Sequence, residues 1–170
     1  MLFRSALATD SVKPVPASAF GERAPESKAW IDSIDDVAKK LGTEGFTLVD
    51  NRTREEFLGK TSGYSYHNIA GHIEGAVYGC AGEVSSSSMY HYRNIDKSMR
   101  NGDEILALWK ELGIDTGNHI SFMCGSGWRV SEIIWYARVM GLNNTSIYSD
   151  GWIAWSDEGR PFVTGDPASK

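Results

Sequence analysis

Cysteine is scarce in this sequence. The 170 residues include only Cys80 and Cys124, and neither lies in a Cys-x-x-Cys pair or beside histidines at metal-ligand spacing. A disulfide framework and a structural zinc site are therefore not expected.

Long apolar runs are missing as well. The apolar N-terminus, residues 1–7, is too short for the core of a signal peptide, and no run approaches the length of a membrane span. We therefore expect a soluble chain.

Positive charge is in the minority. Lys and Arg total 17 against 22 Asp and Glu, which gives a net charge of −5. A general affinity for nucleic acid or for anionic membrane depends on clustered Lys and Arg, so neither partner is expected and any anion site must be local. With 41% hydrophobic and 23% charged residues, the chain has the composition of one globular domain.

Proline is also sparse, and three of the five prolines fall within residues 9–28, a polar stretch without periodicity. Such a composition is typical of an extended linker. We therefore interpret residues 1–28 as a linker or N-terminal extension, residues 29–166 as the folded domain and residues 167–170 as a tail.

Within the folded part, patterns typical of helices alternate with short apolar runs typical of strands. The predicted helices cover residues 34–41, 53–58, 103–112 and 130–140 and a short segment after Gly151, and the predicted strands cover residues 46–50, 76–78, 119–124 and 145–148. Asp32 or Ser33 is expected to cap the first helix, and Asp103 the third. Residues 59–72 and 79–102 have no period and are expected to run over the surface. The alternation predicts an α/β fold with a central parallel sheet and helices on both faces.

The motif most suited to chemistry is the loop CGSGWR, residues 124–129, between a predicted strand and a helix. Ligands of open parallel sheets bind beyond the carboxyl ends of the strands, where Cys124 would lie. Gly125 and Gly127 allow the loop to form a cradle of N–H groups. These groups, the positive end of the helix and Arg129 favour a thiolate at Cys124. Cys80 has no comparable setting and is interpreted as a structural thiol.

Four signatures occur in a fixed order: Asp50-x-Arg52 after a strand, residues 71–76 (GHIEGA), the loop CGSGWR and residues 150–152 (DGW). Together they resemble the rhodanese family over residues 30–165. More narrowly, the chain is similar to the C-terminal catalytic domain of multidomain bacterial thiosulfate sulfurtransferases. The resemblance implies a rhodanese-like domain, located in the periplasm or otherwise in the cytoplasm. It also implies that Asp50 and Arg52 form a buried ion pair. His72 lies in a Gly-His-Ile turn and is expected to cap backbone groups, as turn histidines often do.

The resemblance further implies a double displacement through a persulfide on Cys124, without a cofactor or a metal. The thiolate attacks the outer sulfur of thiosulfate, sulfite departs, and the sulfur passes to a thiol, cyanide or a sulfur-carrier protein. Arg129 would hold the sulfonate oxygens. The backbone N–H groups of Gly125 to Trp128 and the Ser126 hydroxyl would stabilise charge on the sulfur. Trp128 would either line the pocket mouth or simply pack.

The donor and the reaction class stay open at this point. The loop begins like that of the mercaptopyruvate sulfurtransferases but ends in Trp128-Arg129, so 3-mercaptopyruvate is an alternative donor. A cysteine phosphatase also combines a cysteine, an amide cradle and an arginine, although its loop is one residue longer. A non-catalytic or sulfur-relay rhodanese module is the rival from another class, although such modules usually lack the cysteine.

The resemblance also raises the possibility of an upstream rhodanese domain. In related tandem sulfurtransferases the active loop faces a neighbouring domain. We therefore expect this chain alone to leave four side chains more exposed than in a complete pocket, namely those of Tyr64, Tyr66, Trp128 and Arg129.

Overall fold

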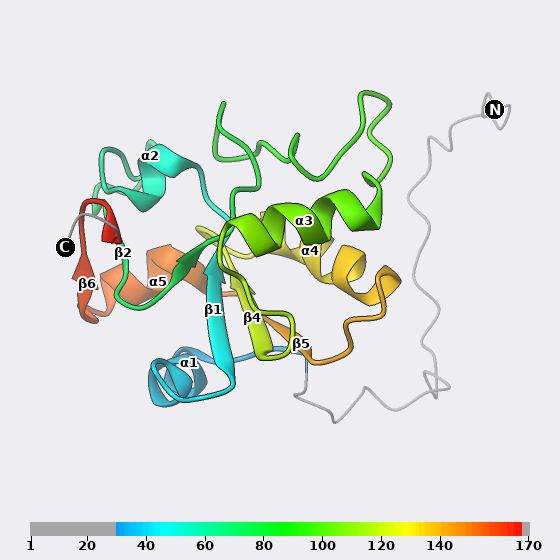
Figure 1. Ribbon diagram of the computed structural model, residues 1–170. Helices are drawn as coiled ribbons and strands as arrows, with labels where there is room; N and C mark the ends of the chain where they lie inside the picture. The colour runs from blue at the N-terminus through cyan, green and yellow to red at the C-terminus, as the bar shows by residue number, and fades with distance from the viewer. Residues whose placement is uncertain (1–29, 168–170) are drawn as a thin grey trace, which may run out of the picture.

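The computed structural model describes residues 30–167 (Figure 1). Four parallel strands form its central sheet, in the order β3-β1-β4-β5. Their bounds are β1 Phe46–Asp50, β3 Val77–Tyr78, β4 His119–Met123 and β5 Thr145–Tyr148. The parallel sheet confirms the predicted α/β class. The expected linker, residues 1–28, and residues 168–170 of the expected tail lie outside the described residues.

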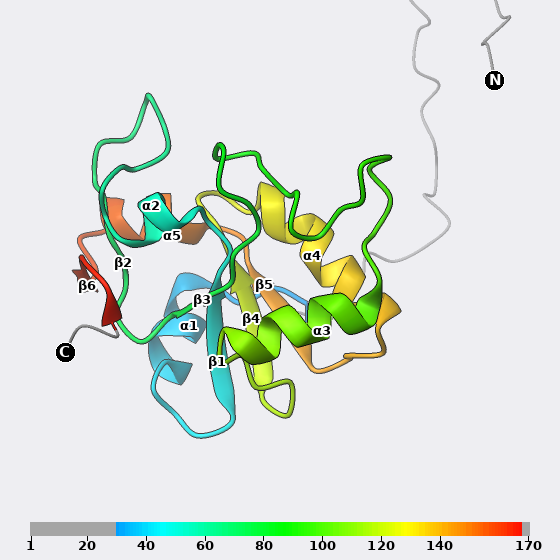
Figure 2. The same cartoon turned by 45° about the horizontal axis from the view of Figure 1, so that its top comes forward.

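Helices cover both faces of this sheet, as predicted (Figures 1 and 2). The helices α3 (Gly102–Glu111) and α4 (Trp128–Val139) pack on one face, and α1 (Ile34–Lys40) and α5 (Gly151–Asp157) pack on the other. Successive residues of a strand point to opposite faces, so Leu48 enters the core under α1 and α5, whereas Val49 enters the core under α3 and α4. In the described part of the chain, no helix is long and apolar enough to span a membrane.

The capping residue predicted from the sequence is correct for α1 and wrong for α3. Ser33 caps α1 in a reciprocal capping box with Asp36, and the hydrogen bonds from Ser33 lower the pKa of the Asp36 carboxyl. The expected cap of α3 was wrong. Asn101 caps this helix, and its side-chain oxygen accepts a hydrogen bond from the Asp103 N–H at 2.8 Å. Asp103 already lies in the first turn of α3, where it cannot adopt the extended backbone of a cap.

Residues 79–101 are irregular, as expected, but they do not simply run over the surface. Met89 and Tyr92 are buried in the core beneath α3 and α4. The Tyr92 hydroxyl donates to the carbonyl of Gly79 at 2.6 Å and accepts from Nε1 of Trp109 at 2.7 Å. The aromatic side chain therefore anchors this segment to the end of β3 and to α3, which a search for periodicity does not detect.

A second, two-stranded antiparallel sheet was not predicted. It pairs β2 (His72–Ile73) with β6 (Phe162–Val163) and lies beside the short helix α2 (Arg54–Phe57) (Figure 1). His72 is buried there, stacks on the Phe57 ring and contacts the Phe57 carbonyl through Nδ1 at 2.7 Å. Burial lowers the pKa of His72, so the neutral imidazole donates this hydrogen bond. The expectation that His72 caps a backbone group is confirmed.

Asp50 and Arg52 form a fully buried ion pair at the end of β1. Arg52 Nη2 donates to the Asp50 carboxylate at 2.7 Å and to the carbonyl of Gly71 at 2.7 Å. The guanidinium also lies over the Trp152 ring, 4.7 Å from its centroid. The pair therefore joins the central sheet to the segment before β2 and to α5, in agreement with the structural role expected from the sequence.

We expect Arg52→Ala to lower the free energy of unfolding by about 3–5 kcal/mol, because it leaves the Asp50 carboxylate buried without a partner. Denaturant unfolding followed by circular dichroism measures this change. Arg100→Ala is the matched control, since it breaks the exposed pair with Glu104 and should cost less than about 1 kcal/mol. Equal losses in the two variants would contradict a structural role for the buried pair.

Candidate active site

Cys124 follows β4 directly, at the carboxyl edge of the sheet, and its side chain is buried. Two backbone hydrogen bonds attach this point to the start of α5. The Trp152 N–H donates to the Cys124 carbonyl at 2.9 Å, and the Ile153 N–H donates to the Gly125 carbonyl at 3.0 Å. Gly151 makes this approach possible, since a Cβ there would lie 2.5 Å from the Cys124 carbonyl oxygen. The DGW signature thus positions the active loop.

The loop makes the sharp turn that its glycines predict. Gly127 has a φ of +83° and precedes α4, and a Cβ there would lie 2.8 Å from the Ser149 carbonyl oxygen. Any side chain at Gly125 would overlap the Tyr64 hydroxyl. Among the described residues, no side chain caps α4. The N–H groups of its first turn therefore remain available to an anion beside Cys124.

Arg129 is 3% exposed, which differs from the exposure expected for it. Its Nη1 and Nη2 donate to the two carboxylate oxygens of Glu56 at 2.9 and 3.0 Å. Burial alone would lower the pKa of Arg129, but the hydrogen bonds and the charge of Glu56 raise it. Its Nε is buried and has no hydrogen-bond partner among the described residues.

Glu56 is a site residue that the sequence did not identify. It belongs to a Thr53-x-x-Glu56 capping box at the start of α2, a pattern that suggests only a local role. The structure shows one carboxylate serving two purposes, since it accepts from the Thr53 N–H at 2.8 Å as well as from Arg129. Glu56 thereby connects α2 to α4.

Tyr64 also lies at the site. Its hydroxyl accepts a hydrogen bond from Nη2 of Arg129 at 3.1 Å. Burial raises the pKa of Tyr64, and a charge on Cys124 raises it further, while the Arg129 cation opposes both effects. The phenol therefore stays protonated at neutral pH and can offer its proton to a ligand.

Cys124 faces a cavity of about 490 Å³. Trp128 and Tyr66 lie at its mouth with 84% and 72% of their surface exposed, as expected for these two side chains. Trp128 therefore lines the pocket mouth and is not a buried packing residue. Gly125 and Gly127 shape the turn and are not among the lining residues. Three segments line the cavity: the active loop with α4, residues 64–66, and residues 86–93. Its lining residues are Tyr64, Tyr66, Ser86, Ser87, Met89, Arg93, Cys124, Ser126, Trp128, Arg129, Ser131 and Glu132.

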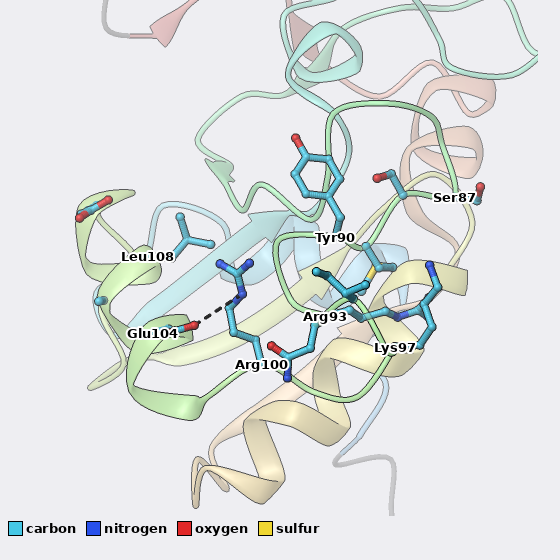
Figure 3. A pocket seen from close by; sticks show the side chains of 13 residues that line it. Ser87, Tyr90, Arg93, Lys97, Arg100, Glu104 and Leu108 are labelled. Carbon is cyan, nitrogen blue, oxygen red and sulfur yellow. Dashed lines mark ion pairs between the residues drawn. The ribbon is translucent and has the colours of Figure 1, made fainter.

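A larger open cavity of about 1030 Å³ adjoins the first, with Ser87, Met89 and Arg93 common to both. Figure 3 shows Arg93, Lys97 and Arg100 projecting from the irregular segment, with Arg100 directed toward Glu104 of α3. Arg93 is paired with Glu132, and Arg100 approaches Glu104 at 3.6 Å. The nearby carboxylates thus offset much of this positive charge.

Cys80 has a different environment. Its side chain is buried after β3, and its Sγ donates a hydrogen bond to the Glu83 carboxylate at 3.5 Å. Burial raises the pKa of the thiol, and the Glu83 charge raises it further. The thiol form of Cys80 is therefore favoured, as expected for a structural cysteine.

Comparison with known proteins agrees with this geometry. Residues 33–158 match the family model described as a rhodanese-like domain. The thiosulfate sulfurtransferase YnjE of Escherichia coli strain K12 is 40% identical over 148 residues, which cover 86% of this chain and 34% of the relative. Its crystal structure matches with a TM-score of 0.81.

Two other proteins are similar to this chain. The human 3-mercaptopyruvate sulfurtransferase is 26% identical over 155 residues, covering 91% of this chain and 48% of that protein. The anaerobic ergothioneine biosynthesis enzyme of Chlorobium limicola, solved with its natural substrate trimethyl histidine, is 36% identical with a TM-score of 0.83 and covers 90% of this chain and 36% of that one. The chain thus spans from about a third to about half of these relatives. It belongs to the rhodanese family.

Proposed function

We propose that this chain is a sulfurtransferase that moves sulfane sulfur from thiosulfate, or from a related donor such as 3-mercaptopyruvate, to a thiophilic acceptor. The observation that carries the proposal is the position of Cys124, which lies at a strand end, borders a cavity and is joined to the uncapped start of α4 by the turn of residues 125–127. Its relatives named as thiosulfate and 3-mercaptopyruvate sulfurtransferases support the same chemistry.

The reaction divides into two displacements on sulfur. In the first, the Cys124 thiolate attacks the outer sulfur of thiosulfate, a new S–S bond forms, and the bond to the sulfonate sulfur breaks with its electron pair leaving as sulfite. In the second, a thiol, cyanide or a sulfur-carrier protein attacks the outer sulfur of the persulfide. The Cys124 thiolate is then regenerated, so no oxidant or reductant is consumed.

The charges around the cavity favour a small anion. Glu56 neutralises most of the Arg129 charge, so the N–H groups at the start of α4 supply much of the attraction. The sulfonate oxygens would accept hydrogen bonds from the Arg129 guanidinium and from the Ser126 hydroxyl, because both residues line the cavity. The backbone N–H groups of Gly125 to Trp128 would stabilise negative charge on the transferred sulfur.

The rival reaction, phosphate ester hydrolysis, needs a protonated carboxylic acid to protonate the leaving group. Glu132 is the carboxylic acid among the described residues that line the cavity. The hydrogen bond from Arg93 lowers the pKa of Glu132, so this group stays ionised at neutral pH. The geometry therefore favours sulfur transfer. The presence of Cys124 likewise disfavours a purely structural module.

The first prediction concerns the two cysteines. Cys124→Ser should abolish sulfur transfer, because a serine hydroxyl cannot form the persulfide, whereas Cys80→Ser should still gain sulfur. Mass spectrometry after treatment with thiosulfate should find one added sulfur on the peptide that contains Cys124. Turnover by Cys124→Ser would contradict the mechanism. Hydrolysis of an aryl phosphate by the unmodified chain would favour the phosphatase reading instead.

The second prediction concerns Arg129. Arg129→Ala should weaken donor binding by about 1.5–3 kcal/mol, roughly a tenfold or greater rise in the thiosulfate concentration at half saturation. It should also destabilise the fold, because Glu56 would be buried without its partner. The double variant Glu56→Gln/Arg129→Ala removes the buried charge, so it should recover stability but not donor binding. Unchanged donor saturation in both variants would contradict a role in binding.

We also propose that residues 29–166 are the folded unit and that residues 1–28 link it to an upstream rhodanese domain, which would cover Trp128 and Tyr66. This chain alone should then form the persulfide but need more donor, because one wall of its cavity is open. Steady-state kinetics would compare the chain with a longer protein that adds a rhodanese domain from a relative before residue 1. Equal donor saturation curves would show that the chain already forms its whole site.

A further inference from the structure

Three side chains that sulfur transfer does not use converge on the loop after β3. They are Cys80, Glu83 and His91, which offer a thiol, a carboxylate and an imidazole. One potential ligand atom from each lies within 4.8 Å of the others. A soft sulfur ligand combined with nitrogen and oxygen is a set typical of zinc and uncommon for magnesium or calcium.

Two features distinguish this cluster from a chance gathering of polar groups. The Nε2 of His91 is buried and has no hydrogen-bond partner among the described residues, which is unusual for a ring nitrogen. Cys80 has a φ of +49°, a backbone conformation that residues with a Cβ rarely adopt. Strain of this kind persists only where the surrounding structure holds the residue in place.

A neighbouring tyrosine orients the carboxylate of the cluster. The Tyr78 hydroxyl donates a hydrogen bond to Glu83 Oε1 at 2.7 Å. Hydrogen bonds of this type fix the direction of metal ligands in established sites. The cluster therefore has both ligand atoms and a supporting contact.

We propose that Cys80, Glu83 and His91 form a zinc site, with a fourth position open to water. On binding, the Cys80 thiol releases its proton to solvent, and its hydrogen bond to Glu83 is replaced by a bond from sulfur to the metal. No redox change accompanies this step. The spacing escapes sequence analysis because the three ligands lie along an irregular loop and match no zinc-finger or Cys-x-x-Cys pattern.

A metal at this site would affect the cavity of Cys124, because the metal-binding loop forms part of the cavity wall. The loop from residue 80 to residue 91 supplies Ser86, Ser87 and Met89 to that cavity. Ligands at both ends of this loop would close it, and the His91 N–H already donates to the Ala81 carbonyl at 3.2 Å. Bound zinc would hold the wall in one position. This inference is independent of which donor or acceptor the enzyme uses.

The test begins with the full chain carrying Cys124→Ser, so that Cys80 is the only thiol left to bind a metal. Titration with Co²⁺, a spectroscopic substitute for Zn²⁺, should produce a thiolate-to-cobalt charge-transfer band in the near ultraviolet, and added Zn²⁺ should remove it. Adding Cys80→Ser should abolish the band. Adding Glu83→Gln or His91→Asn should weaken Co²⁺ binding at least tenfold.

His119→Asn is the matched control, because His119 does not belong to the cluster and lies 3.8 Å from the Asp32 carboxylate. This variant should keep the cobalt band. Thermal unfolding in a chelator verifies that each variant folds, and Zn²⁺ should raise the unfolding temperature of the parent but not of Cys80→Ser.

The absence of a cobalt band in the parent, or its persistence after Cys80→Ser, would overturn the proposal. If Cys80→Ser fails to fold, native mass spectrometry of the parent decides: one bound zinc, lost in His91→Asn and kept in His119→Asn, supports the site. No bound zinc overturns it.

Discussion

The bidentate pair of Glu56 with Arg129 is the contact on which the site depends. Both side chains are buried, so each charge is tolerable only because the other is present. The pair joins α2, which follows β1, to α4, which follows β4, and it sets the direction of the guanidinium beside Cys124. The loop with Tyr64 packs against the same carboxylate, since a side chain at Gly63 would collide with Glu56. The pair thereby determines the geometry of one side of the cavity.

A second set of restraints acts on the backbone of the active loop. The N–H groups at the start of α5 bind the carbonyls of Cys124 and Gly125, so these oxygens point away from the cavity. The uncapped N–H groups of α4 then remain for the ligand. Glycine is required at Gly127 and Gly151 because each has a positive φ and comes too close to a backbone carbonyl for a Cβ. The glycines thus allow the carbonyl groups of the loop to point toward α5 while the N–H groups stay on the side of the Cys124 sulfur.

Much of the fold could be predicted because its determinants are local. Apolar runs set the strands of the central sheet, and Ser33 and the glycines set several element ends. Three features could not be predicted from the sequence, because each depends on the local backbone conformation or on a distant partner. They are the Asn101 cap, the β2–β6 pairing and the burial of Tyr92. The same limit applies to the site. The cradle follows from residues 124–129 alone, but the Glu56 contact joins residues far apart in the sequence. For this reason the sequence predicted an exposed Arg129 that binds the sulfonate and did not predict its partner.

The two cysteines show how surroundings decide what a thiol can do. Cys124 lies beside the positive end of α4 and near the Arg129 cation, and both stabilise negative charge on its sulfur. Cys80 lies against the Glu83 carboxylate, and burial together with that negative charge raises its pKa. The charge of Arg54 lowers the pKa of this thiol, but burial outweighs it, and a bound divalent metal would add the positive charge that a thiolate needs. A single chain can therefore keep one cysteine for reaction with small anions and another for binding a cation, because each lies next to charges of the opposite sign to its ligand.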